Sequence, residues 1–194
     1  MKVSAEEREE NHKKIIATAA TALREHGING IGVDGIMQRA GFTAGGFYNH
    51  FQSKEGLIGE ALKYSFEQAA DNLNAVAQKT RGDRLNALVS EYLSAEARDH
   101  PESSCVTSAV GCEVRNRSTE VRKIFSGGIE DVVGMIASYI PNGTRSEKRA
   151  RAVAAVSALT GALMVARGVH EKEFSDEILR STRSILLKVL NGSD

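Results

Sequence analysis

Hydrophobic side chains recur at intervals of three and four residues along almost the whole chain, which is the periodicity of amphipathic helices. The pattern predicts an all-α protein of about nine helices, without repeats or low-complexity linkers. We expect these helices at roughly 15–26, 33–40, 44–51, 54–79, 85–100, 105–115, 118–140, 146–168 and 175–190, the first preceded by a charged run at 6–14. Breaks are expected where glycine or proline interrupts the pattern, at Gly27, Gly41, Gly82, Pro101 and Pro141.

A short apolar face from Val33 to Ala40 marks the second of these helices. Ile36 and Met37 lie between them at helical spacing, so the four side chains share one face. Gly41 follows where a residue in the left-handed conformation commonly ends a helix. We therefore expect a sharp turn there.

A third helix is expected directly after this turn, because Thr43 can cap it with a hydroxyl that accepts a backbone N–H. Phe47 and Phe51 lie four residues apart and can both face the core. The side chains between them then point outward with donors and acceptors free; they are Tyr48, Asn49 and His50. Two short helices joined by a glycine turn form the helix-turn-helix arrangement, whose second helix enters the major groove of DNA.

The residues around this second helix suit a phosphate backbone. Gly45 and Gly46 lack side chains and would let the main chain come close to the groove. Ser53 can cap the next helix, and Lys54 in its first turn would hold a phosphate together with free backbone N–H groups. Between residues 36 and 54 the chain carries Arg39 and Lys54 and no acid.

The segment AGFTAGGFYNHFQSKEGL, residues 40–57, resembles the signature of the tetracycline-repressor family of transcription regulators. The matching positions are Ala40, Gly41, Thr43, Gly45, Phe47, Tyr48, His50, Phe51, Ser53, Lys54, Glu55 and Leu57, and the match extends upstream through Gly27, Val33 and Ile36. Two positions depart from the family pattern. Ala44 stands where many relatives carry lysine or another polar residue, which removes one expected DNA contact. Gly32 replaces the usual serine or threonine cap, at a cost of only a few tenths of a kcal/mol.

The resemblance covers about the first third of the chain and implies a helix-turn-helix DNA-binding domain at 1–53 and an effector-binding and dimerisation domain at 54–194. It implies a homodimeric regulator, most often a repressor, that binds a near-palindromic double-stranded operator and is released by a small-molecule effector. The expected DNA-binding residues are Arg39, Thr43, Ala44, Gly45, Gly46, Tyr48, Asn49, His50 and Lys54.

Broad apolar stripes mark the last two expected helices. From periodicity alone, internal core explains such a stripe better than an interface does, since most apolar helical stripes are internal. In similar regulators the last two helices pair with their copies in a four-helix bundle, so the resemblance favours a dimer interface. The residues expected there are Val153, Val156, Leu159, Leu163, Ile178, Thr182, Ile185 and Leu186.

The middle helices would enclose the effector, and their large apolar side chains are explained either as pocket lining or as core. Few polar partners accompany them, which favours an apolar or aromatic ligand. The residues expected to line the pocket are Leu62, Phe66, Leu88, Tyr92, Cys105, Ala109, Phe125 and Ile129.

Cys105 and Cys112 lie seven residues apart, on one face of the expected sixth helix and roughly 10 Å from each other, which is too far for a disulfide. Two interpretations stay open. Both thiols can be small buried hydrophobes, or Cys105 at the helix start can sense electrophiles or oxidants through a depressed pKa, as in some similar regulators. His100 and these cysteines do not form a zinc spacing, so no metal site is expected.

Composition limits the alternatives. The 25 acidic and 25 basic residues give a net charge of zero, so DNA affinity must come from a local patch. No apolar run approaches the roughly 18 to 20 residues that span a membrane and no signal-peptide core is visible, so we expect a cytoplasmic protein without a membrane partner. No nucleophile or phosphate-loop motif appears, so neither enzymatic activity nor a cofactor is expected. A helical adaptor is the remaining alternative, and it predicts that the region of Tyr48 and Lys54 is dispensable.

Overall fold

The computed structural model describes residues 4–30 and 32–192. In these ranges the chain forms nine α-helices and two short 3-10 helices and no β-strand. The elements are α1 (Ala5–His26), α2 (Val33–Arg39), η1 (Ala44–Asn49), α3 (Lys54–Lys79), α4 (Arg84–Tyr92), α5 (Ala95–Asp99), η2 (Pro101–Ser103), α6 (Thr107–Val114), α7 (Thr119–Tyr139), α8 (Arg145–Gly168) and α9 (Lys172–Asn191). The expected all-α fold is confirmed.

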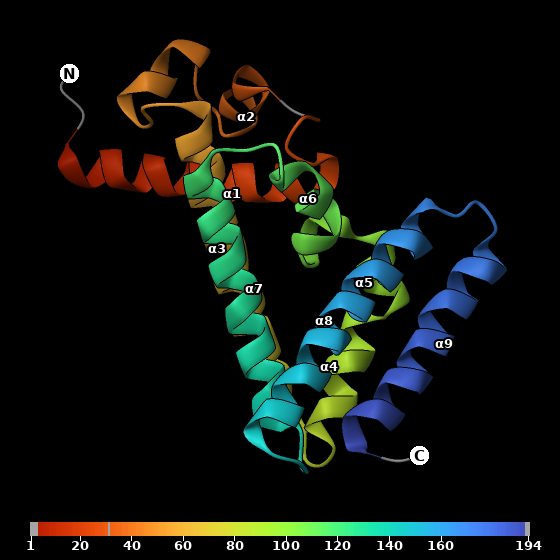
Figure 1. Cartoon of the computed structure of the whole chain (residues 1–194). Coiled ribbons are helices and arrows are strands. Elements are labelled where there is room, and N and C mark those ends of the chain that lie inside the picture. The colour runs from red at the N-terminus through yellow and green to blue at the C-terminus, as the bar shows by residue number, and fades with distance from the viewer. Residues whose placement is uncertain (1–3, 31, 193–194) are drawn as a thin grey trace.

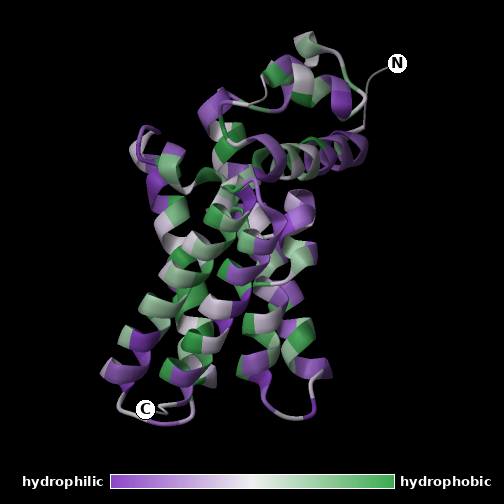
Figure 2. Ribbon diagram, turned by 90° about the vertical axis from the view of Figure 1, so that its right-hand side faces the viewer, coloured by the Kyte–Doolittle hydropathy of each residue, from purple (hydrophilic) through white to green (hydrophobic). Residues whose placement is uncertain are grey.

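The first helices form a head at one end of the molecule, and the remaining helices form a body (Figure 1). α1 crosses the top of the body, with α2 and η1 packed above it, while α3 leads from the head into the body. α3 and α7 both start beneath the head and pack along each other, and α8 and α9 form an antiparallel pair on the far side. Green hydrophobic bands run along the body helices between purple hydrophilic ones (Figure 2).

Two hydrophobic clusters hold this arrangement. The first joins the head to the upper body, since it contains Ile15, Met37 and Phe47 from the head together with Leu57, Leu62, Val106, Val110 and Val121 from α3, α6, α7 and the turn before α6. The second lies between α4, α7, α8 and α9. Ile129 and Val132 on α7 pack against both clusters.

The helix ends follow the capping residues. Gly41 has φ +84° and the N–H of Phe42 bonds back to the carbonyl of Met37 at 2.8 Å, which ends α2 with the expected sharp turn. The Ser53 hydroxyl accepts from the N–H of Gly56 at 3.1 Å, so α3 starts where the sequence predicts. The first helix instead begins earlier than expected, at Ala5, because its charged run is itself helical and solvent-exposed.

The fifth and sixth expected helices differ from the prediction. The single helix expected at 85–100 is broken at Leu93, because Ser94 caps a new helix by accepting the N–H of Ala97 at 3.0 Å. The helix expected from residue 105 starts later, at Thr107, and the hydroxyls of Ser103 and Ser104 donate backward to the carbonyls of His100 and Pro101.

The third expected helix forms as a 3-10 helix, η1, and its predicted cap is absent. Thr43 makes no side-chain capping bond, and its backbone carbonyl accepts the N–H of Gly46 at 3.0 Å instead. Gly45 and Gly46 have low helix propensity, which is consistent with a short, tightly wound segment.

The apolar stretch in α8 is longer than the sequence analysis allowed. An 18-residue window of this helix has a mean hydropathy of 1.3, enough by length and composition alone to cross a membrane. Core helices pass the same test, and α8 packs between α7 and α9 with 39% of that window buried. We therefore assign the stretch to the body of the protein.

Candidate nucleic-acid interface and ligand cavity

The outer face of the head presents one large aromatic side chain. Tyr48 is 79% exposed, whereas Phe47 and Phe51 are buried with their rings stacked at 5.5 Å. The ring of Tyr48 rests edge-on against Phe47 at 5.2 Å, which limits its motion while its hydroxyl stays free. Asn49 beside it is also exposed. This pair is placed to contact a molecule outside the head.

Two cations from α1 reach the same region and were missed in the sequence analysis. Arg8 donates to the backbone carbonyl of Asn49, and the ammonium of Lys14 lies 5.5 Å from the ring centre of Phe42. Both belong to a run that also contains four glutamates, so nothing in the sequence set them apart. The structure places them beside the turn and the end of η1.

His50 does not point outward as expected. Its imidazole is half-buried among the rings of His12 and Phe42, at 6.0 and 6.3 Å, and its Nδ1 is buried with no hydrogen-bond partner among the described residues. Burial lowers the pKa of His50, and the positive charges of His12 and Arg8 lower it further. The ring is therefore neutral near pH 7 and forms part of the wall behind the outer face.

Arg39 and Lys54 differ in how freely they can act. The guanidinium of Arg39 binds Glu25 at 2.7 Å and His26 at 3.0 Å, so its charge is largely neutralised by α1. Glu25 and His26 lie more than ten positions away on α1, so the sequence did not show this pairing. Lys54 is half-buried in the first turn of α3, beside the exposed Ser53.

The glycines of η1 leave open space on this face. A Cβ added at Gly45 would meet nothing within 4 Å, and one at Gly46 would make ordinary contact with Met37. Ala44 and Gly45 are both exposed. The N-terminal turn of η1 is thus accessible to a large partner such as a groove of DNA.

Side chains of α6 and the following turn tie the body to the head. Glu113 accepts the backbone N–H groups of Ile28 and Asn29 at 3.2 and 2.9 Å. Arg117 donates to the side chain of Asn29 at 2.6 Å and lies 3.5 Å from Glu55, which in turn accepts the Ser118 N–H at 3.0 Å. Although burial opposes it, the bond from Ser118 and the charge of Arg117 lower the pKa of Glu55.

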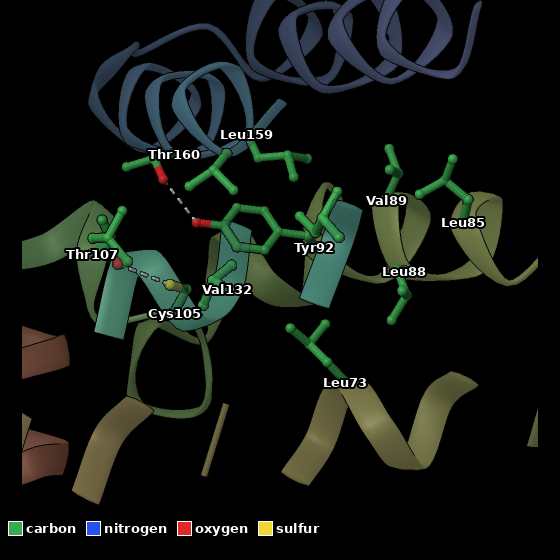
Figure 3. Close-up of a pocket in the computed structure, with 13 residues that line it drawn as sticks. Leu73, Leu85, Leu88, Val89, Tyr92, Cys105, Thr107, Val132, Leu159 and Thr160 are labelled. Atoms are coloured by element: carbon green, nitrogen blue, oxygen red, sulfur yellow. Dashed lines mark hydrogen bonds between the residues drawn. The ribbon is translucent and has the colours of Figure 1, made fainter. Parts of the chain in front are cut away.

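The body contains two adjoining cavities, an inner and an outer chamber, which share part of their lining. The inner chamber is almost entirely apolar and narrow, with a volume of about 30 Å³; its walls come from α3, α4, α7, α8, the turn before α6 and the first residue of α6 (Figure 3). The outer chamber is larger, about 380 Å³, and more polar, and it lies beside η2. Four residues line both chambers: Leu73, Tyr92, Cys105 and Val132.

Tyr92 lies where the chambers meet. Its hydroxyl is 3.4 Å from the hydroxyl of Thr160, and the Cys105 thiol donates to Thr107 at 3.3 Å (Figure 3). Burial and the nearby Cys105 raise the pKa of Tyr92, while the bond to Thr160 opposes this. The phenol therefore stays neutral and supplies a polar group inside an apolar wall.

Known proteins resemble both the head and the whole chain. A family model described as bacterial regulatory proteins of the TetR family matches residues 15–61. The transcriptional repressor NemR of Escherichia coli K12 is 23% identical over 137 residues, 69% of each chain. The repressor KstR2 of Rhodococcus jostii is 26% identical over 127 residues, 60% of this chain and 62% of the relative. A TetR regulator from Chloroflexus aurantiacus has a solved structure with TM-score 0.79 and 18% identity, covering 97% of this chain and 98% of that one. The chain belongs to the TetR family.

The TetR-family body places the predicted effector residues in two groups. Leu88, Tyr92, Cys105 and Ile129 line the cavity. The other four pack in the cluster beneath the head, where Phe66 meets Phe125 edge-on at 5.9 Å, so their predicted place on the cavity wall is corrected; they are Leu62, Phe66, Ala109 and Phe125. Sequence periodicity marks all eight as inward-facing and cannot tell which inward position borders a void.

The predicted dimer residues of this TetR-family chain are also divided. Val153 and Ile185 are exposed, and Ile178 and Thr182 are half-buried. The other four are buried within the chain itself, which corrects their assignment to an interface: Val156, Leu159, Leu163 and Leu186. The outward faces of α8 and α9 carry further large apolar side chains that the sequence analysis did not select, namely Met164, Val165, Phe174 and Val189.

The two cysteines do not share one helix, contrary to expectation. Cys105 precedes α6 and is half-buried at the cavity, whereas Cys112 lies on α6 and is exposed. Both are free thiols, and no cluster of potential metal ligands occurs among the residues that the structure describes.

Proposed function

We propose that this TetR-family protein is a ligand-responsive transcriptional repressor, which binds a near-palindromic operator as a homodimer and leaves it when a small molecule fills the cavity. Regulators of this family bind operator DNA, typically as dimers. The observation that carries the proposal is the connection between the two sites. Glu113 and Arg117, in α6 and the turn that follows it, hold the head, while Cys105 and Thr107 at the start of the same segment line the cavity. We assign DNA binding to residues 1–53 and the other roles to 54–194.

The exposed face of η1 and the start of α3 supply the proposed DNA contacts. Thr43, Tyr48 and Lys54 position the phosphate backbone, and the residues near the bases are Ala44, Gly45, Gly46 and Asn49. Arg39 and His50 support this surface from behind, because the first is paired with Glu25 and the second is half-buried. Because few side chains lie near the bases, we expect the main chain of η1 to approach the DNA closely and to make much of the contact itself.

The outward faces of α8 and α9 supply the proposed dimer interface. Large apolar side chains rarely gather on a surface without a partner. Two copies joined through these faces would form a four-helix bundle and hold the two heads at a fixed separation, as a two-fold operator requires. The apolar residues proposed for the contact are Val153, Met164, Val165, Phe174, Ile185 and Val189.

A ligand releases DNA only if it binds one arrangement of the heads better than the other. The cavity lies between the dimerising helices and the segment that holds the head, so filling it can favour one arrangement. We further infer that the protein acts in the cytoplasm and catalyses no reaction. Cys105 lines the cavity, which keeps sensing of electrophiles or oxidants as a second candidate; it predicts that Cys105→Ser abolishes the response.

Gel-shift measurement on an operator selected from random duplex DNA tests the DNA-binding part. Tyr48→Ala and Lys54→Ala should each weaken binding severalfold or more, because each removes a phosphate contact. Lys79→Ala, at the other end of α3 and far from the head, is the matched control and should bind as the wild type does. Undiminished binding by both head variants would favour the adaptor. A screen in which no small molecule or oxidant changes binding would remove the ligand response.

A further inference from the structure

We propose that Arg24 is the receptor for an anionic group, and that the outer chamber therefore takes an amphipathic anion: a carboxylate or similar group at Arg24 and an apolar body along the wall that this chamber shares with the inner one. This inference rests on the proposed function, because it specifies the ligand class of the same cavity.

Arg24 is a buried cation without a carboxylate partner. Only 8% of its surface is exposed, yet it lines the outer chamber. Its Nε donates to the backbone carbonyl of Glu102 at 2.7 Å and its Nη2 donates to the side-chain oxygen of Gln68 at 3.3 Å, and both acceptors are neutral. No hydrogen bond from Nη1 is found within the described part of the chain. The guanidinium thus keeps a donor and a full charge next to the cavity.

The acidic side chains nearest to Arg24 are engaged elsewhere. The carboxylate of Glu25 binds Arg39 at 2.7 Å and His26 at 3.2 Å. That of Glu102 lies 3.0 Å from His100. Burial lowers the pKa of Arg24 despite the opposing influence of Tyr64, Cys105 and Glu25, as expected when no charge compensates a buried cation.

The second cation near the cavity behaves differently. Arg167 donates to the carbonyls of Arg98 and Ala97 at 3.2 and 2.6 Å and to the hydroxyls of Ser108 and Ser104. Every nitrogen of its guanidinium is therefore used to join α8 to α5 and α6. Arg24 is the cation with capacity left for a ligand.

The mouth of the outer chamber also carries acids, which argue against an exposed anion site. Glu91 and Glu96 are exposed, so water screens their charge, whereas Arg24 is buried and bonded to Gln68. A buried charge is compensated by a ligand more effectively than a solvated one. The wall that the outer chamber shares with the inner one is mostly apolar, with Leu73 and Val132 beside the ring of Tyr92 and the thiol of Cys105, and it suits the apolar body.

The position of Arg24 also links ligand and head. It belongs to the last turn of α1, the helix that supports α2 and η1. An anion that binds its guanidinium competes with the Glu102 carbonyl and with Gln68, which are the contacts of this side chain with η2 and α3. The ligand therefore touches the DNA-binding head directly.

Competition among three ten-carbon compounds tests the proposal on the full-length protein. The neutral dye N-phenyl-1-naphthylamine reports occupancy of the cavity, and decanoate, decanol and decylamine displace it. We expect decanoate to bind about tenfold or more tightly than decanol, since a charge-assisted hydrogen bond adds to the same apolar contact. Stronger binding by decylamine than by decanoate would show that the acidic residues at the mouth select the ligand. Equal binding by decanoate and decanol would show that Arg24 does not bind the carboxylate. Either result overturns the proposal.

Variants separate a ligand role from a structural one. Arg24→Gln should reduce decanoate binding to the level of decanol and leave decanol unchanged. Gln68→Leu keeps the cation and removes one competitor, so decanoate should bind at least as well as to the wild type; a loss there, with folding intact by circular dichroism, contradicts the proposal. If the dye itself does not bind, the cavity takes no such ligand, and the ligand-responsive part of the proposed function falls with the inference, while operator binding is still measured independently.

Discussion

The carboxylate of Glu113 lies 2.9 Å from the backbone nitrogen of Asn29, where it accepts a hydrogen bond from the turn that follows the first helix of the head. Its second contact, to the N–H of Ile28 at 3.2 Å, makes one side chain of the body a cap for two main-chain donors of the head. Because α6 begins at the cavity and carries Glu113, this contact relates the position of the head to the cavity wall.

Replacing Glu113 by glutamine should lower the free energy of unfolding by about 1 kcal/mol, because a neutral acceptor binds N–H groups more weakly than a carboxylate does. Urea unfolding followed by circular dichroism measures the change. Glu10→Gln, which alters an exposed side chain on α1, should have little effect. An equal loss in the two variants would mean that the contact with Asn29 contributes nothing of its own.

His50 should make the head less stable in mild acid. Its pKa is lowered in the folded protein, while the unfolded chain has the ordinary value of about 6.5. Above that pH both states are neutral; as the pH falls below it, the unfolded state binds the proton first, and the stability contribution declines until the folded pKa is passed. Urea unfolding at roughly pH 7.5 and 5.5 should show a smaller acid-induced loss for His50→Gln than for the wild type. An identical loss would contradict the prediction.

The close approach of α3 and α7 depends on Gly128. A Cβ there would lie 2.3 Å from the ring of Phe66, so Gly128→Ala must displace that ring and should destabilise the protein by roughly 1–3 kcal/mol. Gly134→Ala in the same helix meets no atom within 4 Å and should instead stabilise it by about 0.5–1 kcal/mol. Thermal unfolding of the two variants distinguishes a packing effect from helix propensity. Stabilisation by both would show that the ring moves without cost.

Substitutions at two adjacent residues of α9 should affect different properties, dimerisation in one case and stability in the other. Ile185 is 59% exposed, so Ile185→Glu should dissociate the dimer while leaving the helical content unchanged. Leu186 is buried in the second cluster, and Leu186→Ala should lower stability by about 2–5 kcal/mol. Analytical ultracentrifugation and urea unfolding separate the effects. A dimer that survives the glutamate would place the interface elsewhere.

Local chemistry explains what the sequence predicts well. Ser53 and Gly41 act on their own neighbours, so the start of α3 and the turn after α2 follow from adjacent residues. By contrast, α8 has apolar side chains on two faces, and only its packing against the other body helices decides that Leu159 is internal and Met164 external. In the sequence, Arg24 is simply a polar residue near the end of a helix. Its partners, the Glu102 carbonyl and the Gln68 side chain, are neutral and lie more than forty positions away, so the sequence does not reveal that it has no acidic partner.

The first hydrophobic cluster has a consequence for any attempt to treat the head as a transferable module. Since Ile15 and Met37 share that cluster with Leu57, Val110 and Val121, the head and the upper body should fold and unfold as one cooperative unit. A fragment ending at residue 53 would expose the head's half of the cluster to water. A chimaera that transplants this operator specificity must therefore carry over the start of α3, α6 and the first turns of α7 as well.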